Sequence, residues 1–156
     1  MKNLFSNNKG VSKIIADLTE TAQYLWEKGW AERNAGNISV RITELLIEEN
    51  LYFEPHSFFQ FSENYSHLAD QVFLVTGSGK RMRDLAKNPI ENVLIIKISS
   101  DGNSYTVLST EQEIIPTSEL PTHLMIHQQL LLNNAPEKVV MHAHVLELIA
   151  FTHYKE

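Results

Sequence analysis

The chain has 156 residues and a net charge of −6, and 43% of its residues are hydrophobic. This length suits one domain with a substantial core. The acidic balance argues against a nucleic-acid partner bound through a basic face, although a small anionic substrate needs only a few local donors. The chain contains no cysteine, which excludes disulfides, thiolate metal ligands and thiol nucleophiles within it. No stretch is typical of a signal peptide or a membrane span, so we expect a cytoplasmic protein with no membrane partner.

The first half of the chain predicts a helix, a strand and a long irregular segment. Apolar residues recur at helical spacing between Val11 and Gly29, which predicts an amphipathic helix ending at Gly29. Residues 31–37 read as a loop and residues 38–42 as a strand. Residues 43–71 are rich in aromatic side chains and are expected to be an irregular excursion on the same domain, because a linker would be polar.

The second half predicts an antiparallel pair and a helix that leads into a last strand. Residues 70–86 read as a strand, a glycine turn and a helix, and residues 92–109 as two strands joined through Asp101 and Gly102. Residues 116–134 predict a helix that Ser118 could cap, with Pro121 in its first turn. A strand over 138–144 and the start of a helix follow. This mixture predicts an α/β sandwich rather than a pure βαβ series.

Two histidines lie one residue apart in the last predicted strand. Residues i and i+2 of a strand face the same way, so His142 and His144 could present two imidazoles to one zinc ion. Two partly exposed histidines at a strand end fit the pattern equally. A catalytic zinc usually has three protein ligands, and after His144 the chain offers only His153, which a helix would carry away.

A second histidine pair lies on the predicted helix. His123 and His127 are spaced i, i+4 and share one helix face. Leu124 follows His123, so the pair lacks the glutamate of the HExxH zinc motif. The pattern therefore favours hydrogen-bonded histidines on a half-buried helix over a metal site.

Two glycine-containing loops could hold a phosphate. The stretch "TGSGK" is not a P-loop, since Leu74 and Arg81 stand where that motif needs glycine and serine or threonine. It leaves a turn before a helix, which suits one phosphate or is a plain tight turn. Asn34 and Asn37 flank Gly36, and their amides could donate to a phosphate or simply shape a turn.

A carboxylate lies at the start of the predicted helix. Glu119 in "PTSEL" could be favoured there by the helix dipole. It could instead be a general acid/base beside a metal ion, and the local sequence does not decide between the two.

Taken together, four motifs resemble those of the class II aldolase/adducin-like family. They are "ERNAGNIS", "VTGSGK", "PTSELPTH" and "VVMHAHVLELIAFTH", and they occur in this order over nearly the whole chain. The segment "LWEKGWAERNAGNISVRI", the long insertion after it and the 23-residue interval from Glu119 to His142 resemble the members that act on L-rhamnulose 1-phosphate more than those that act on fuculose phosphate.

The resemblance implies a fold and a site. The fold would be a three-layer α/β/α sandwich with a largely antiparallel central sheet, assembled as a homotetramer. His142 and His144 would be zinc ligands and Glu119 the catalytic acid/base. Five residues would surround the phosphate of dihydroxyacetone phosphate: Asn34, Asn37, Ser78, Gly79 and Ser118.

The resemblance also implies that residues 1–156 are one domain truncated at its C-terminal side. The family pattern has a third zinc histidine, and further strands and helices, downstream of the HxH pair. We therefore expect this portion alone to be inactive, and the whole to be a zinc-dependent aldolase. Two alternatives stay open: another sugar-phosphate aldolase, epimerase or dehydratase of the same fold, and a non-enzymatic adducin-like module.

Overall fold

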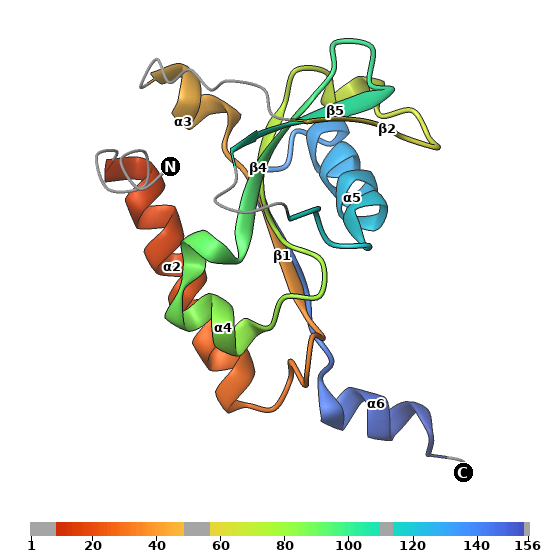
Figure 1. The fold of residues 1–156 in the computed structure, drawn as a ribbon. Helices are drawn as coiled ribbons and strands as arrows, with labels where there is room; N and C mark the ends of the chain where they lie inside the picture. Colours follow the sequence, from red (N-terminus) through yellow and green to blue (C-terminus); the bar gives the residue numbers. More distant parts are fainter. Residues whose placement is uncertain (1–8, 49–56, 110–113, 155–156) are drawn as a thin grey trace.

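The computed structural model describes residues 9–48, 57–109 and 114–154, which form a mixed α/β fold (Figure 1). Its helices and strands follow one another as α2 (Lys9–Glu27), β1 (Asn37–Arg41), α3 (Thr43–Glu48), β2 (Ser57–Gln60), η1 (Ser66–Leu68), β3 (Val72–Thr76), α4 (Met82–Lys87), η2 (Pro89–Glu91), β4 (Val93–Ile98), β5 (Ser104–Ser109), α5 (Leu120–Leu132), β6 (Val139–His142) and α6 (Leu146–Thr152). Among the described residues, no helix combines the length and apolarity that crossing a bilayer would need.

The strands form one antiparallel sheet, as the family resemblance implies. The order is β2-β5-β4-β3-β1-β6, and every neighbouring pair runs antiparallel. The predicted hairpin is present, because β4 and β5 pair and are joined through Asp101 and Gly102.

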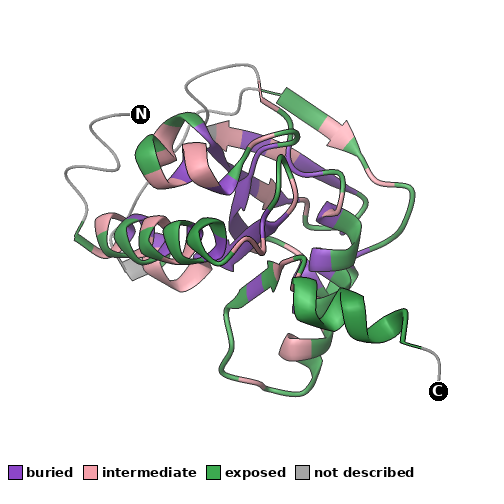
Figure 2. Ribbon diagram, turned by 90° about the horizontal axis from the view of Figure 1, so that it is seen from below, coloured by how far each residue is buried: buried purple, intermediate pink, exposed green. Residues whose placement is uncertain are grey.

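Helices cover both faces of the sheet. Helices α2 and α4 pack on one face and α5 on the other (Figure 1). Two separate hydrophobic clusters correspond to these interfaces, one containing Leu18 and Ile38 and the other Leu124 and Phe73. The buried residues accordingly run through the sheet and the inward faces of these helices (Figure 2). The expected three layers are therefore present in this part of the fold.

Three local expectations differ from the structure. The segment 43–71 is not wholly irregular, since it contains α3, the edge strand β2 and η1; its residues 49–56 lie outside the described residues. Helix α2 ends at Glu27, and the chain turns at Gly29, whose φ is +71°. Strand β6 ends at His142, two residues earlier than expected, because the N–H of His144 donates to the carbonyl of Trp30 instead of continuing the ladder.

The strand register brings three chain segments to one end of the sheet. Ser39 lies opposite Val75 of β3, and Asn37 lies opposite His142 of β6. Because both neighbours run antiparallel to β1, the start of β1 meets the ends of β3 and β6. The β-bridge between Gly77 and Pro116 brings the segment before α5 to the same place.

The hairpin glycine gives a test of the fold. Gly102 has φ +72°, and a Cβ there would lie 2.4 Å from the backbone nitrogen of Ser66. We predict that Gly102→Ala lowers the free energy of unfolding by more than about 3 kcal/mol, because a left-handed residue and a backbone clash must both be accommodated. Urea unfolding of the protein measures this.

Gly79→Ala is the matched control. Gly79 has a similar φ of +68°, but a Cβ there would meet nothing within 4 Å. Its cost should be limited to the backbone strain, about 1 kcal/mol. Equal losses for the two variants would show that the packing of Gly102 against residues 65–66 is unimportant.

Candidate functional site

A polar pocket of about 540 Å³ lies where these segments meet. It is lined by three stretches that are far apart in the sequence, residues 32–37, 77–80 and 117–119, together with His144. The predicted site residues among them are Asn34, Asn37, Ser78, Gly79, Ser118, Glu119 and His144. The structure thus brings together residues that the sequence could place only on separate motifs.

The loop before β1 is shaped by unusual backbone conformations. Arg33 and Gly36 both have positive φ, +52° and +84°. A Cβ at Gly36 would lie 3.3 Å from the Cβ of Ala31 and 3.4 Å from the carbonyl oxygen of His142. Only glycine combines this conformation with so close an approach. The loop of residues 32–37, called the asparagine loop below, is therefore held directly against residues 142–144, called the histidine segment.

The two asparagines of this loop have different surroundings. Asn34 is exposed at the pocket. Asn37 is only 6% exposed, and its Oδ1 lies 2.5 Å from Nε2 of His123. Both ends of the Asn34 amide are therefore available to a ligand. In Asn37, Oδ1 is used by His123, and the NH₂ group is the end left for a ligand.

The glycine turn after β3 differs from a phosphate-binding loop. The N–H of Ser78 donates to the carbonyl of Ile115 at 2.8 Å, and that of Lys80 to Gly77 at 3.3 Å. These two N–H groups are therefore used within the protein, as in the plain tight turn that the sequence also allowed. The Ser78 side chain and Gly79 line the pocket and remain the candidate contacts of this turn.

Glu119 lies at the N-terminal end of α5. It is the N-cap residue of the helix, and no side chain caps the helix there, so the predicted cap by Ser118 is wrong. Ser118 is exposed and lines the pocket instead. Oε2 of Glu119 is in direct contact with Nδ1 of His142. The helix start thus directs its carboxylate at the histidine segment.

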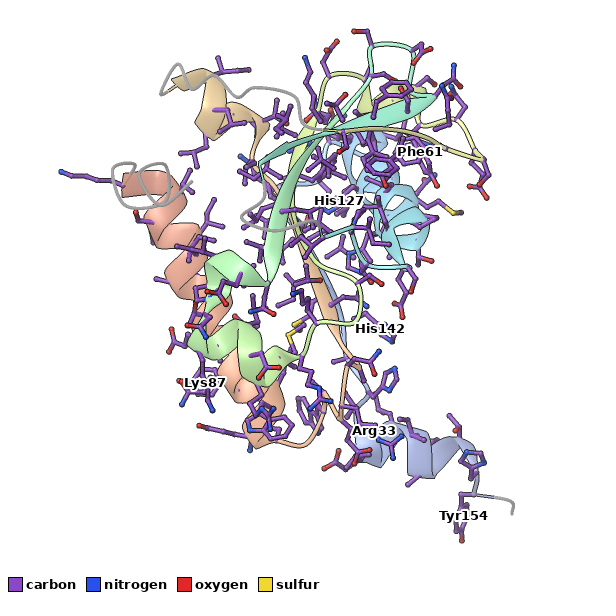
Figure 3. All side chains as sticks on the ribbon, viewed as in Figure 1. Arg33, Phe61, Lys87, His127, His142 and Tyr154 are labelled. Atoms are coloured by element: carbon purple, nitrogen blue, oxygen red, sulfur yellow. The ribbon has the colours of Figure 1, made fainter. Side chains whose placement is uncertain are left out.

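His142 and His144 lie side by side even though the strand ends between them. Their ring centroids are 4.9 Å apart and the ring planes are inclined by 57°. Figure 3 shows His142 near the end of β6, on the side of α5. Nδ1 of His142 is buried and has no aligned hydrogen-bond partner despite its contact with Glu119.

The described residues do not by themselves complete a metal site. No group of three or more histidine, cysteine, aspartate or glutamate side chains within them could hold a metal ion. His142, His144 and the nearby carboxylate of Glu119 fit two ligands and a neighbouring base. A catalytic zinc would need at least one further ligand.

The second histidine pair is buried and hydrogen-bonded, as the sequence favoured. His123 and His127 are each 1% exposed, and both contact Oγ of Ser39, at 2.7 and 2.8 Å. Figure 3 shows His127 between the sheet and α5. Burial lowers the pKa of each imidazole to about 4, so both are neutral at pH 7. They serve the interface between β1 and α5, not a metal ion in the described structure.

Comparison with known proteins assigns the fold and the family. Residues 16–156 match the model of the class II aldolase and adducin N-terminal domain. The chain belongs to the class II aldolase and adducin family. It is 44% identical to a rhamnulose-1-phosphate aldolase of Bacteroides thetaiotaomicron over 154 residues, and 38% identical to one of Klebsiella pneumoniae over 148 residues. A sugar-phosphate aldolase of Thermotoga maritima has a similar structure, with a TM-score of 0.76 and 29% identity, covering 94% of this chain and 59% of that one.

The chain spans about half the length of these class II aldolases. It aligns over 98% of its own residues with 57% of the Bacteroides protein, and over 92% with 53% of the Klebsiella protein. The comparison therefore covers only part of each of these relatives.

Sequence reasoning missed several residues that line this pocket in the class II aldolase domain. Lys80 and Arg33 bring positive charge to its wall, and Thr117 lies between the turn and Glu119. Lys80 belongs to "TGSGK", which matches no nucleotide-binding motif. Its position directly after a glycine turn was the signal that could have found it.

The neutral state of His127 predicts how stability depends on pH. Burial, with the nearby His123 and Arg41, lowers its pKa from 6.5 to about 4. The unfolded chain then takes up a proton near pH 6.5, and the folded chain only near pH 4. The free energy of unfolding should therefore be highest above pH 6.5 and fall as the pH falls below this value. His127 should account for a loss of about 1.4 kcal/mol per pH unit, which reaches about 3 kcal/mol at pH 4.

His127→Gln tests this contribution, because glutamine does not titrate but keeps a donor near Ser39. Urea unfolding at pH 7, 6 and 5 should show a shallower loss of stability in the variant than in the wild type. Parallel pH dependences would contradict the neutral, buried state of His127. Titrating groups that do not contact Ser39 affect both proteins equally and cancel in the comparison.

Proposed function

We propose that this chain is the N-terminal portion of a zinc-dependent aldolase that cleaves L-rhamnulose 1-phosphate to dihydroxyacetone phosphate and L-lactaldehyde. The observation that carries the proposal is the single pocket in which Glu119 and His144 face the asparagine loop and the glycine turn. The identity of 44% to a rhamnulose-1-phosphate aldolase supports the choice of substrate.

Zinc would be held by His142 and His144, with a third ligand from outside the described residues. Their adjacent rings, and the carboxylate of Glu119 in contact with His142, suit a cation at this place. Bound there as a Lewis acid, zinc would stabilise the negative charge that cleavage leaves on the ketone-bearing product.

The phosphate would be bound at the opposite side of the pocket. Asn34 and Asn37 can donate amide N–H bonds, Ser78 and Ser118 can donate hydroxyl bonds, and Gly79 lets the backbone come close. Lys80 and Arg33 at the pocket wall would offset the phosphate charge in a protein whose net charge is −6. Fixing the phosphate orients the reacting carbon toward Glu119.

Glu119 would act as the general acid/base. Its carboxylate lies at the start of a helix, between the histidine segment and the pocket. From there it can take the proton from C3 of dihydroxyacetone phosphate in the condensation direction and return it after cleavage. This role is supported by the position of Glu119 beside His142 and at the pocket wall.

Assembly and location belong to the same proposal. We place the whole enzyme in the cytoplasm, where phosphorylated sugars are retained, and expect a homotetramer. Residues 1–156 would be one truncated domain and would be inactive alone, because two histidines supply only part of a catalytic zinc shell.

Substrate assays distinguish this proposal from the related chemistries. The full-length protein, supplied with zinc, should release dihydroxyacetone phosphate from L-rhamnulose 1-phosphate faster than from L-fuculose 1-phosphate. The reverse preference would assign a different aldolase. Zinc binding without turnover of either sugar would favour the non-enzymatic module.

Glu119→Gln tests the acid/base role. Glutamine keeps the size and the helix position of the side chain but cannot exchange a proton. Turnover of the full-length enzyme should fall by about 10²–10⁴, the usual contribution of such a group, while the zinc content stays unchanged. Glu91→Gln, an exposed carboxylate outside the pocket, is the control. Near-normal turnover in Glu119→Gln would remove Glu119 from this role.

Asn34→Ala tests the phosphate side of the pocket. Asn34 is exposed, so its loss should leave the fold intact. Binding of dihydroxyacetone phosphate should weaken by about 1.5–3 kcal/mol, the value of a hydrogen bond to a charged group, and binding of dihydroxyacetone should change little. Calorimetric titration measures both, with Asn88→Ala as an exposed control. Equal losses for the two ligands would assign the loop a structural role only.

A further inference from the structure

The face of β1 that packs on α5 is polar, although it is buried. Ser39 is 0% exposed and Asn37 6% exposed, and the helix places two histidines against them. Buried polar groups are costly unless they are hydrogen-bonded. These four side chains satisfy one another in a line from His127 through Ser39 and His123 to Asn37, whose amide lies at the pocket.

The line of hydrogen bonds has a direction. Each neutral imidazole carries a single N–H. Oδ1 of Asn37 faces Nε2 of His123 at 2.5 Å, so this nitrogen must carry the hydrogen and donate it. Nδ1 of His123 then accepts from the hydroxyl of Ser39 at 2.7 Å. Since the Ser39 hydrogen is used, its oxygen accepts from Nε2–H of His127 at 2.8 Å.

This direction determines what Asn37 offers to the pocket. An asparagine amide has an acceptor end and a donor end, and the wrong end toward an anion would repel it. With Oδ1 held by His123, only the NH₂ group is left for a ligand. The opposite arrangement would reverse every bond of the line and turn the carbonyl oxygen of Asn37 toward the pocket.

We propose that His123 is a positioning residue that, supported by Ser39 and His127, holds the Asn37 amide with its donor end toward the phosphate of the substrate. The proposal deepens the function proposed above and rests on it. His123 itself does not touch the ligand in this role. Because His123 fixes the Asn37 amide beforehand, the amide does not have to reorient when the anion binds. Donors preorganised in this way bind an anion more tightly.

The test compares His123→Met with His123→Gln in the full-length protein. Methionine fills the space but donates no hydrogen bond, whereas glutamine can return a donor close to the position of Nε2. His123→Met should weaken binding of dihydroxyacetone phosphate and of inorganic phosphate about 10- to 100-fold, the loss of one hydrogen bond to a charged group, and that of dihydroxyacetone less than about threefold. His123→Gln should restore most of the phosphate affinity.

Leu124→Ala controls for loosened packing of α5, because Leu124 is fully buried on the next position of the same helix. It should lower stability without separating phosphorylated from unphosphorylated ligands. If His123→Met weakens both ligands equally, or neither, the proposed positioning role is wrong. If the wild type binds neither phosphate ligand, the proposed function is wrong, and the role of His123 that rests on it is wrong as well.

A spectroscopic measurement on the wild type does not depend on the variants folding. The ¹⁵N chemical shifts of the His123 ring should show the hydrogen on Nε2 and a bare, accepting Nδ1 at pH 7. The opposite tautomer would mean that the line of bonds is reversed, and it would overturn the proposal even if the protein binds phosphate.

Discussion

The antiparallel pairing of β1 with β3 and β6 is the constraint on which the site depends. It places the start of one strand beside the ends of two others, so the asparagine loop, the glycine turn and the histidine segment converge. The register is specific, because Asn37 lies directly opposite His142 and Gly36 fits against the carbonyl of that histidine. A shift by one residue would turn Asn37 to the α2 face and separate the two motifs.

Successive side chains of β1 point to opposite faces of the sheet, so this strand packs against two different helix layers. Ile38 and Val40 belong to the cluster beneath α2 and α4, while Asn37 and Ser39 face α5. An apolar α5 would leave those polar groups without partners. The histidines of α5 resolve this conflict, since they fill a core position with a ring and still offer a donor and an acceptor. The same interface thus contributes to the core and reaches the pocket.

The sequence predicted what local spacing determines and missed what distant segments determine. The hairpin at Asp101–Gly102 and the hydrogen-bonded histidine pair follow from turn chemistry and periodicity, and the structure confirms them. The antiparallel sheet, also confirmed, was implied by the family resemblance. The use of the Ser78 N–H by Ile115 is a contact across 37 positions, which no local pattern reveals. The early end of β6 has the same origin, because Trp30 takes the N–H of His144.

The helix cap illustrates the remaining difficulty. Ser118 and Glu119 both stand at the start of α5, and residue preferences favour serine as the cap. The structure gives the N-cap position to Glu119 and leaves Ser118 at the pocket. A general propensity for caps could not decide this, because the bridge between Gly77 and Pro116 and the bond from the Thr117 N–H to Thr76 fix where the helix begins.

The path of the chain between Glu119 and His142 explains why one carboxylate can serve a distant histidine. Helix α5 carries the chain about 20 Å away from the pocket, from its 13 residues at 1.5 Å each. Strand β6 then returns to the same end of the sheet, since it pairs with β1 up to Asn37. The two ends of this excursion meet as Glu119 Oε2 against His142 Nδ1, in contact but not aligned as a hydrogen bond. The fold itself therefore brings this carboxylate and this imidazole together, because α5 leaves the same end of the sheet to which β6 returns.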